Sequence, residues 1–113
     1  MEGSDRASAH GEVLRIWSDI LGGRLTVADR GWNEDSRTIS LVRHSNARPL
    51  TRTERSVLIL VSCGVSNQDA GELLNCRSST IATHLATVSD KLSARRLDLV
   101  AFGPLLEPLM EGR

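Results

Sequence analysis

The spacing of hydrophobic residues predicts a helix in the first part of the chain. From about His10 to Leu21, apolar side chains recur at every third or fourth position, the period at which a helix gathers them on one face. This apolar stripe contains Val13, Ile16, Trp17, Ile20 and Leu21. We expect Gly22 and Gly23 to end the helix, because glycine accepts the positive φ found after a helix C-terminus. Residues 1–8 are small and polar, so a disordered N-terminus is expected there.

The period then changes to two, which indicates β-strands. Leu25 and Val27 alternate with polar or small residues, and so do Ile39 and Leu41. The segment between them, residues 30–36, is rich in turn-forming residues, so we predict an antiparallel hairpin. An isolated hairpin is only marginally stable in water, and this one must therefore pack on the first helix, on the second half of the chain or on a partner.

Helix-capping signals dominate the second half of the chain. Thr51 and Glu54 form the pattern T-x-x-E, a capping box that opens a helix. Ser66 and Asp69 repeat this arrangement for a second, shorter helix. Gly64 lies between the two helices, where a left-handed residue is expected to stop the first one.

Two more helices are predicted after a turn at about residues 75–78. The third helix has a buried face composed of Ile81, Leu85, Val88 and Leu92. The fourth spans about residues 95–102 and ends before Gly103 and Pro104. The chain is therefore expected to be mainly α. Its predicted parts are residues 1–8 (disordered), 9–45 (helix plus β-hairpin for dimerisation or docking), 46–49 (linker), 50–106 (a four-helix domain) and 107–113 (a C-terminal tail).

Composition excludes several function classes. With 113 residues, the chain is too short for a Rossmann or barrel enzyme. It has no P-loop, no nucleophile elbow and no Cys/His cluster with metal-ligand spacing, so we expect no enzyme activity, no catalytic residue, no metal and no cofactor. Apolar runs are too short to span a bilayer and no signal segment opens the chain, so a soluble, cytoplasmic protein with reduced cysteines is expected.

The helical half resembles a known family. Two short helices joined by a tight turn suggest a helix-turn-helix, and the stretch from Leu50 to Phe102 is similar to the DNA-binding domain of LuxR-type (NarL/LuxR-like) bacterial transcription regulators. The matching landmarks lie in register without a gap. They are Leu50, Thr51, Arg52, Glu54, Val57, Leu58, Gly64, Ser66, Asn67, Glu72, Leu74, Thr80, Ile81, Thr83, His84, Lys91, Leu92, Arg96, Leu99 and Val100.

The resemblance implies a DNA-binding regulator whose third helix enters the major groove. By position, the helix residues expected at DNA are Ser79, Thr80, Ala82, Thr83, His84, Ala86 and Thr87. Threonine hydroxyls can bond phosphates or base edges, and methyl groups can contact thymine methyls. His84 is expected to bond either a phosphate or its own domain. Cations that could contact phosphates are Arg52, Arg77 and Lys91.

The family's fourth helix commonly contributes to dimerisation, so a homodimer is expected. Candidate interface residues are Trp17, Ile20, Arg96, Leu97 and Val100. Trp17 belongs either to the core or to an interface. Trp32 either packs on the hairpin or marks a contact surface.

Some positions depart from the family pattern. Ala82 replaces the usual Lys, and Leu85 stands where Arg or another polar residue is frequent. Gly71 replaces Ala and is expected to cost about 1 kcal/mol inside a helix. The usual Ser cap of the third helix is Arg77, so Ser78 is expected to cap one residue late. These departures predict weak DNA binding by a monomer.

A second function class therefore stays open. The chain holds 14 Lys+Arg and 14 Asp+Glu, whereas a nucleic-acid binder usually has a basic excess. The alternative is a protein-interaction adaptor with a degenerate helix-turn-helix, contacting another regulator or RNA polymerase through Leu85 or the surface around Ala82 and Ala86. The leading hypothesis remains a sequence-specific, homodimeric regulator that binds double-stranded DNA and no membrane.

Overall fold

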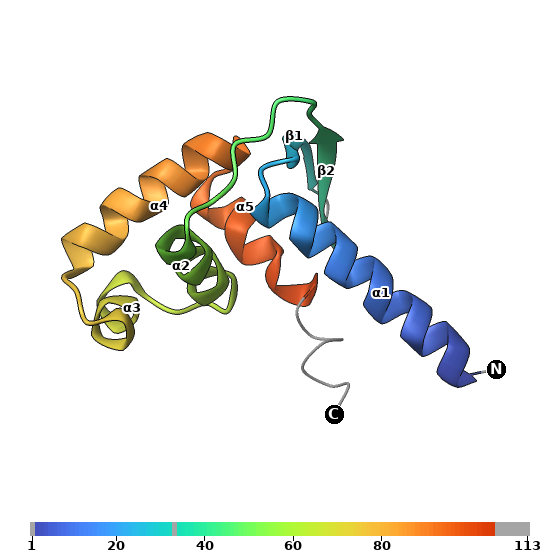
Figure 1. Cartoon of the computed structure of the whole chain (residues 1–113), viewed down its shortest axis with the longest axis horizontal. Coiled ribbons are helices and arrows are strands. Elements are labelled where there is room, and N and C mark those ends of the chain that lie inside the picture. The colour runs from blue at the N-terminus through green and yellow to red at the C-terminus, as the bar shows by residue number, and fades with distance from the viewer. Residues whose placement is uncertain (1, 33, 106–113) are drawn as a thin grey trace.

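A long helix and a two-stranded sheet precede a group of short helices (Figure 1). The computed structural model describes residues 2–32 and 34–105. The elements are α1 (Glu2–Leu21), β1 (Leu25–Trp32), β2 (Arg37–Arg43), α2 (Arg52–Ser62), α3 (Asn67–Leu74), α4 (Ser78–Leu92), α5 (Arg96–Ala101) and η1 (Gly103–Leu105). The mainly helical fold with one hairpin is as the sequence predicts. The expected tail, residues 107–113, lies outside the described residues.

Helix α1 is longer than the hydrophobic period indicates. It begins at Glu2, whereas disorder was expected for residues 1–8. The stretch from residue 2 to residue 9 contains no proline and no β-branched side chain, so the helix can continue through it although Gly3 disfavours helix formation. The helix ends as predicted, because Gly23 adopts a φ of 71°. Figure 1 shows α1 extending away from the other elements, with its N-terminal end farthest out.

The hairpin is antiparallel, as predicted, but its strands run further than the alternation suggests. The register pairs Thr26 with Val42 and Arg30 with Ile39, with an irregularity between Val27 and Asp29. An extra residue of this kind bends the strand and increases its twist. The expected loop, residues 30–36, is therefore wrong in its first three positions, which belong to β1. The ladder continues there because its hydrogen bonds are made by the backbone, whatever the side chains are.

The predicted caps of α2 and α3 are present. The Thr51 backbone N–H donates to Glu54 Oε1 at 2.9 Å, and the Glu54 N–H donates to Thr51 Oγ1 at 3.2 Å. Ser66 Oγ accepts from the Asp69 N–H at 3.1 Å. Gly64 has a φ of 84°, the left-handed stop expected after α2. These local signals fix where α2 and α3 begin and end.

One hydrophobic core joins both halves of the chain. Ile20 from α1 and Val27 from β1 belong to the same buried cluster as Leu58 and Leu92 from the later helices. The Trp17 ring also packs edge-on against the ring of Phe102, with 6.3 Å between centroids. The hairpin thus packs both on α1 and on the helices of the second half, which are two of the three partners left open by the sequence.

The expected linker is held against α1. The Leu50 N–H donates to the Leu21 carbonyl oxygen at 2.9 Å. Beside it, Gly23 lies so close to the chain that a Cβ on this glycine would stand 2.1 Å from the Arg48 carbonyl oxygen. Residues 46–49 therefore connect the two halves in a fixed path.

Candidate nucleic-acid interface

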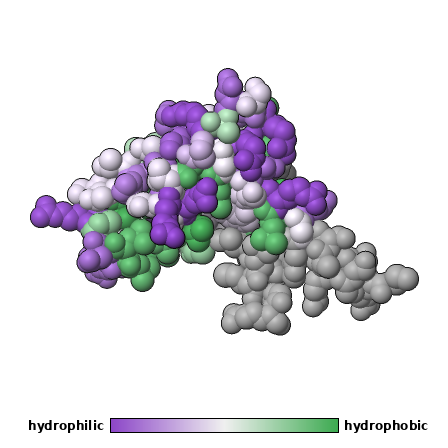
Figure 2. Space-filling model, in the orientation of Figure 1, coloured by the Kyte–Doolittle hydropathy of each residue, from purple (hydrophilic) through white to green (hydrophobic). Residues whose placement is uncertain are grey.

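Helix α4 has two distinct faces. One face is buried and holds Ile81, Leu85, Val88 and Leu92, as the hydrophobic period predicts. The opposite face is exposed at Ser79, Ala82, Thr83 and Ala86, and Thr87 and His84 are partly exposed along its flanks. Figure 2 shows mostly pale colours over α4, since these residues are neither strongly polar nor strongly apolar. The structure thus places the candidate DNA-contacting residues of this helix together on one surface.

A tight turn fixes α4 against α3. Asn75 ends α3 in a left-handed conformation, with a φ of 58°, and the Cys76 N–H donates to the Gly71 carbonyl oxygen at 2.8 Å. A Cβ added at Gly71 would lie 2.6 Å from the Cys76 carbonyl oxygen. The expected helix-propensity cost of Gly71 is therefore only part of its effect, because in this chain the missing Cβ lets the turn approach α3 closely.

Two threonines of this surface, Thr83 in the exposed face and Thr87 on its flank, bond their own helix. The Thr83 hydroxyl donates to the Ser79 carbonyl oxygen at 3.1 Å, and the Thr87 hydroxyl donates to the Thr83 carbonyl oxygen at 3.3 Å. Their hydroxyl protons are thus engaged, whereas the oxygen lone pairs and methyl groups stay available. Ala82 and Ala86 add two more methyl groups to this face.

Of the three cations expected at phosphates, Lys91 has another role. Its ammonium donates to Glu54 Oε1 at 2.7 Å and to the Pro49 carbonyl oxygen at 3.1 Å, and its side chain is only 16% exposed. These internal bonds take two of the three N–H donors of the ammonium, and the expected contact of Lys91 with a phosphate stays a prediction. Arg52 and Arg77 are exposed, and within the described residues neither guanidinium group has a hydrogen bond or ion pair.

The first turn of α4 has no side-chain cap. Arg77 occupies the cap position with extended backbone, and Ser78 is already the first helical residue, so the expected late cap by Ser78 is not formed. Among the backbone N–H groups of this turn, that of Thr80 donates to the Arg77 carbonyl oxygen at 3.0 Å. Such a helix end favours negative charge through its dipole and its free N–H donors.

The residues proposed for a dimer interface separate into two groups. Trp17 and Ile20 are 4% and 0% exposed, so they belong to the core of a single chain and are not available as a free surface. Leu97 and Val100 on α5 are exposed, at 62% and 38%. Arg96, on the same helix, donates to Asn67 Oδ1 at 2.7 Å. The side chain of Trp32 lies outside those that the structure describes.

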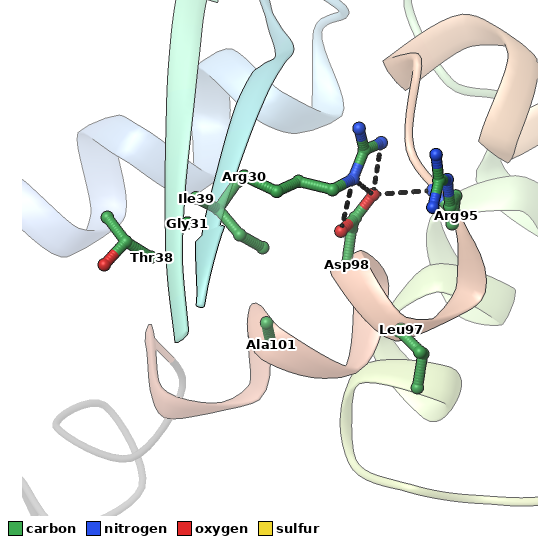
Figure 3. A pocket seen from close by; sticks show the side chains of 8 residues that line it. All are labelled: Arg30, Gly31, Thr38, Ile39, Arg95, Leu97, Asp98 and Ala101. Atoms are coloured by element: carbon green, nitrogen blue, oxygen red, sulfur yellow. Dashed lines mark hydrogen bonds and ion pairs between the residues drawn. The ribbon is translucent and has the colours of Figure 1, made fainter. Parts of the chain in front are cut away.

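An ion pair missed by the sequence reading ties the hairpin to α5. Arg30 Nη2 lies 2.6 Å from Asp98 Oδ2, and the Arg95 backbone N–H donates to the same oxygen at 2.8 Å (Figure 3). Ile39 and Ala101 line an adjoining pocket of about 300 Å³ between the hairpin and α5. The local signal available was the acidic residue three positions after Arg95, which indicates a helix start but not the distant partner Arg30.

Glu54 and Asp98 should make the protein acid-sensitive. Burial alone would raise the pKa of each carboxyl group, but hydrogen bonds and the nearby cation outweigh it, so both pKa values are lowered. Glu54 accepts from Lys91 and from the Thr51 N–H. Asp98 accepts from Arg30 and from the Arg95 N–H. Their stabilisation is complete above the unfolded-state pKa values of about 4 and is lost as the pH falls through the lowered folded-state values. Urea unfolding measured below about pH 4 should show this loss. An Asp98→Asn variant should have a lower free energy of unfolding at neutral pH than the wild type and should lose less of it on acidification. Equal pH dependence of unfolding in the variant and the wild type would contradict the stabilising role of the Asp98 carboxylate.

Neither a membrane span nor a metal cluster is found in the part of the chain that the structure describes. No helix there is both long enough and apolar enough to cross a bilayer. In the same residues, no three His, Cys, Asp or Glu side chains come together in a way that could hold a metal ion.

The arrangement of α2, α3 and α4 defines a helix-turn-helix unit. Two helices meet at the tight turn around Asn75, and the second presents an exposed face of small side chains. In agreement, residues 48–101 match the family model of bacterial regulatory proteins of the luxR family. This match confirms the resemblance noted in the sequence over residues 50–102. No curated protein and no solved structure matches the chain significantly.

Proposed function

We propose that the protein is a transcription regulator that binds double-stranded DNA in a sequence-dependent way, with α4 in the major groove. The exposed face of α4 is the observation that carries this proposal. Its central side chains are small, so the helix can approach base edges closely, and a major groove admits one α-helix. The guanidinium groups of Arg52 and Arg77, which have no partner among the described residues, lie on α2 and at the start of α4, where they can contact phosphates.

Two copies are proposed to bind together through α5. Leu97 and Val100 are exposed apolar residues on this helix, which gives a second copy a surface on which to pack. Dimerisation doubles the number of phosphate contacts, which compensates for the formal net charge of zero of a single chain.

Replacing Thr83 with Glu tests the position of α4. A carboxylate on this face would meet the phosphate-lined groove, so the variant should bind a selected duplex about 100-fold more weakly. Fluorescence anisotropy with the full chain, at two salt concentrations, measures the loss. Ser18→Glu on α1 is the matched control, because it adds the same charge at an exposed position outside the proposed surface and should leave binding near the wild-type value. Full binding by Thr83→Glu would contradict the proposal.

A protein-interaction adaptor is the second candidate function. Leu73 on α3 is 66% exposed, and Figure 2 shows a hydrophobic area over this helix, which favours contact with a protein. Leu85, in contrast, is buried and not available for that role. A folded wild-type protein that binds no duplex even at low salt would favour the adaptor over the DNA-binding regulator.

A further inference from the structure

The centre of the exposed face of α4 offers methyl groups. Ala82, Thr83, Ala86 and Thr87 recur at the three- and four-residue spacing that places them on one side of the helix. Each carries one methyl group. None of the four carries a charge or an amide, which are the groups that most often read base edges by paired hydrogen bonds.

The same four residues supply no free hydrogen-bond donor. Alanine has none, and the hydroxyl protons of Thr83 and Thr87 are engaged by carbonyl oxygens one turn earlier. The threonine oxygens can still accept a hydrogen bond. A guanine presents two acceptors in the major groove, N7 and O6, and would find no donor on these four side chains, whereas thymine presents a methyl group and adenine an N6–H donor.

We infer that the centre of α4 recognises A·T pairs through the methyl group of thymine. This inference rests on the proposed function, since it requires α4 to lie in the major groove. Thymine methyls pack against the methyl groups of Ala82, Thr83, Ala86 and Thr87, and adenine N6–H groups donate to the threonine oxygens. Arg52 and Arg77 contact phosphates and contribute to affinity without selecting sequence.

Deoxyuridine tests this inference, because it pairs like thymidine but lacks the C5 methyl group. The full chain is first used to select binding sites from a random duplex pool, which should enrich A·T pairs at the contacted positions. Each thymine of a selected site is then replaced by uracil and the Kd is measured. At a contacted position the Kd should rise about fourfold, the value expected for one buried methyl group. Thymines outside the protected footprint serve as controls and should give no change.

Two replacements of Thr83 separate methyl recognition from an effect of uracil on DNA shape. Thr83→Ser keeps a hydroxyl and removes the methyl group, so its affinity ratio between thymine and uracil should fall toward one at a single position. Thr83→Val removes the hydroxyl and keeps methyl groups, so its ratio at that position should stay close to the wild-type ratio. The inference would be overturned if the preference for thymine over uracil at that position were lost in the Thr83→Val variant and kept in the Thr83→Ser variant.

The outcomes also distinguish this inference from the proposed function. Salt-dependent, site-selective binding that is unaffected by uracil at every position would overturn methyl recognition while leaving DNA binding intact. Selected sites with guanine at the contacted positions would do the same. No duplex binding by the folded chain would overturn the proposed function, and the inference with it.

Discussion

Replacing Gly23 with Ala should lower the free energy of unfolding by about 3 kcal/mol or more, since two separate costs add at this position. The residue has a φ of 71°, which an L-residue with a side chain adopts at a cost of about 1–2 kcal/mol. In addition, the new Cβ would stand 2.1 Å from the carbonyl oxygen of Arg48, so the backbone of residues 46–49 or that of Gly23 must move. Urea unfolding followed by circular dichroism measures the change.

Gly64 provides the matched control for this experiment. Its φ is also positive, at 84°, but a Cβ there would meet nothing within 4 Å. Gly64→Ala should therefore cost only the backbone term, about 1–2 kcal/mol. The difference between the two variants isolates the close approach between Gly23 and Arg48. Equal losses of stability would show that this contact does not constrain the fold.

Replacing Lys91 with Met should cost about 3 kcal/mol, because it leaves the buried carboxylate of Glu54 without its cation. The two side chains are 16% and 8% exposed, and their 2.7 Å ion pair connects α4 to the start of α2. Removal of the ammonium also leaves the Pro49 carbonyl oxygen without this donor. Chemical unfolding of Lys91→Met, Glu54→Gln and the double variant should give a double-variant cost smaller than the sum of the single costs.

The neighbouring pair of Arg48 and Asp90 is the control for this cycle. Its 3.0 Å contact joins side chains that are 56% and 71% exposed, so solvent screens it. Asp90→Asn should change the free energy of unfolding by less than about 1 kcal/mol. In anisotropy titrations, Lys91→Met should keep the wild-type salt dependence of DNA binding. A shallower dependence would contradict the internal role of this lysine.

Local signals explain why the helices of the second half could be predicted. Thr51 with Glu54, Ser66 with Asp69, and Gly64 each act within three or four residues, so their spacing is visible in the sequence. The buried stripe of α4 is visible for the same reason, and its opposite face follows from it. The family resemblance then assigns these elements to a helix-turn-helix, and the match over residues 48–101 supports that assignment.

Contacts between distant parts of the chain could not be predicted. Lys91 and Glu54 are separated by 37 residues, and Arg30 and Asp98 by 68, so no spacing rule joins them. The internal partners of Lys91 are therefore visible only in the folded chain. Gly71 resembled a weak point of α3, because only the folded turn shows how near the Cys76 carbonyl oxygen lies.

The fixed connection between α1 and the helix-turn-helix unit means that a rotation of α1 would move both ends of this connection together. Helix α1 has 20 residues and is about 30 Å long, and its C-terminal end is clamped to residues 48–50 while its other end projects outward. A tilt of about 10° at the clamped end would move the far end by about 5 Å, given that length. A tilt of α1 would therefore be transmitted to residues 48–50 and the start of α2, which a flexible connection would not do.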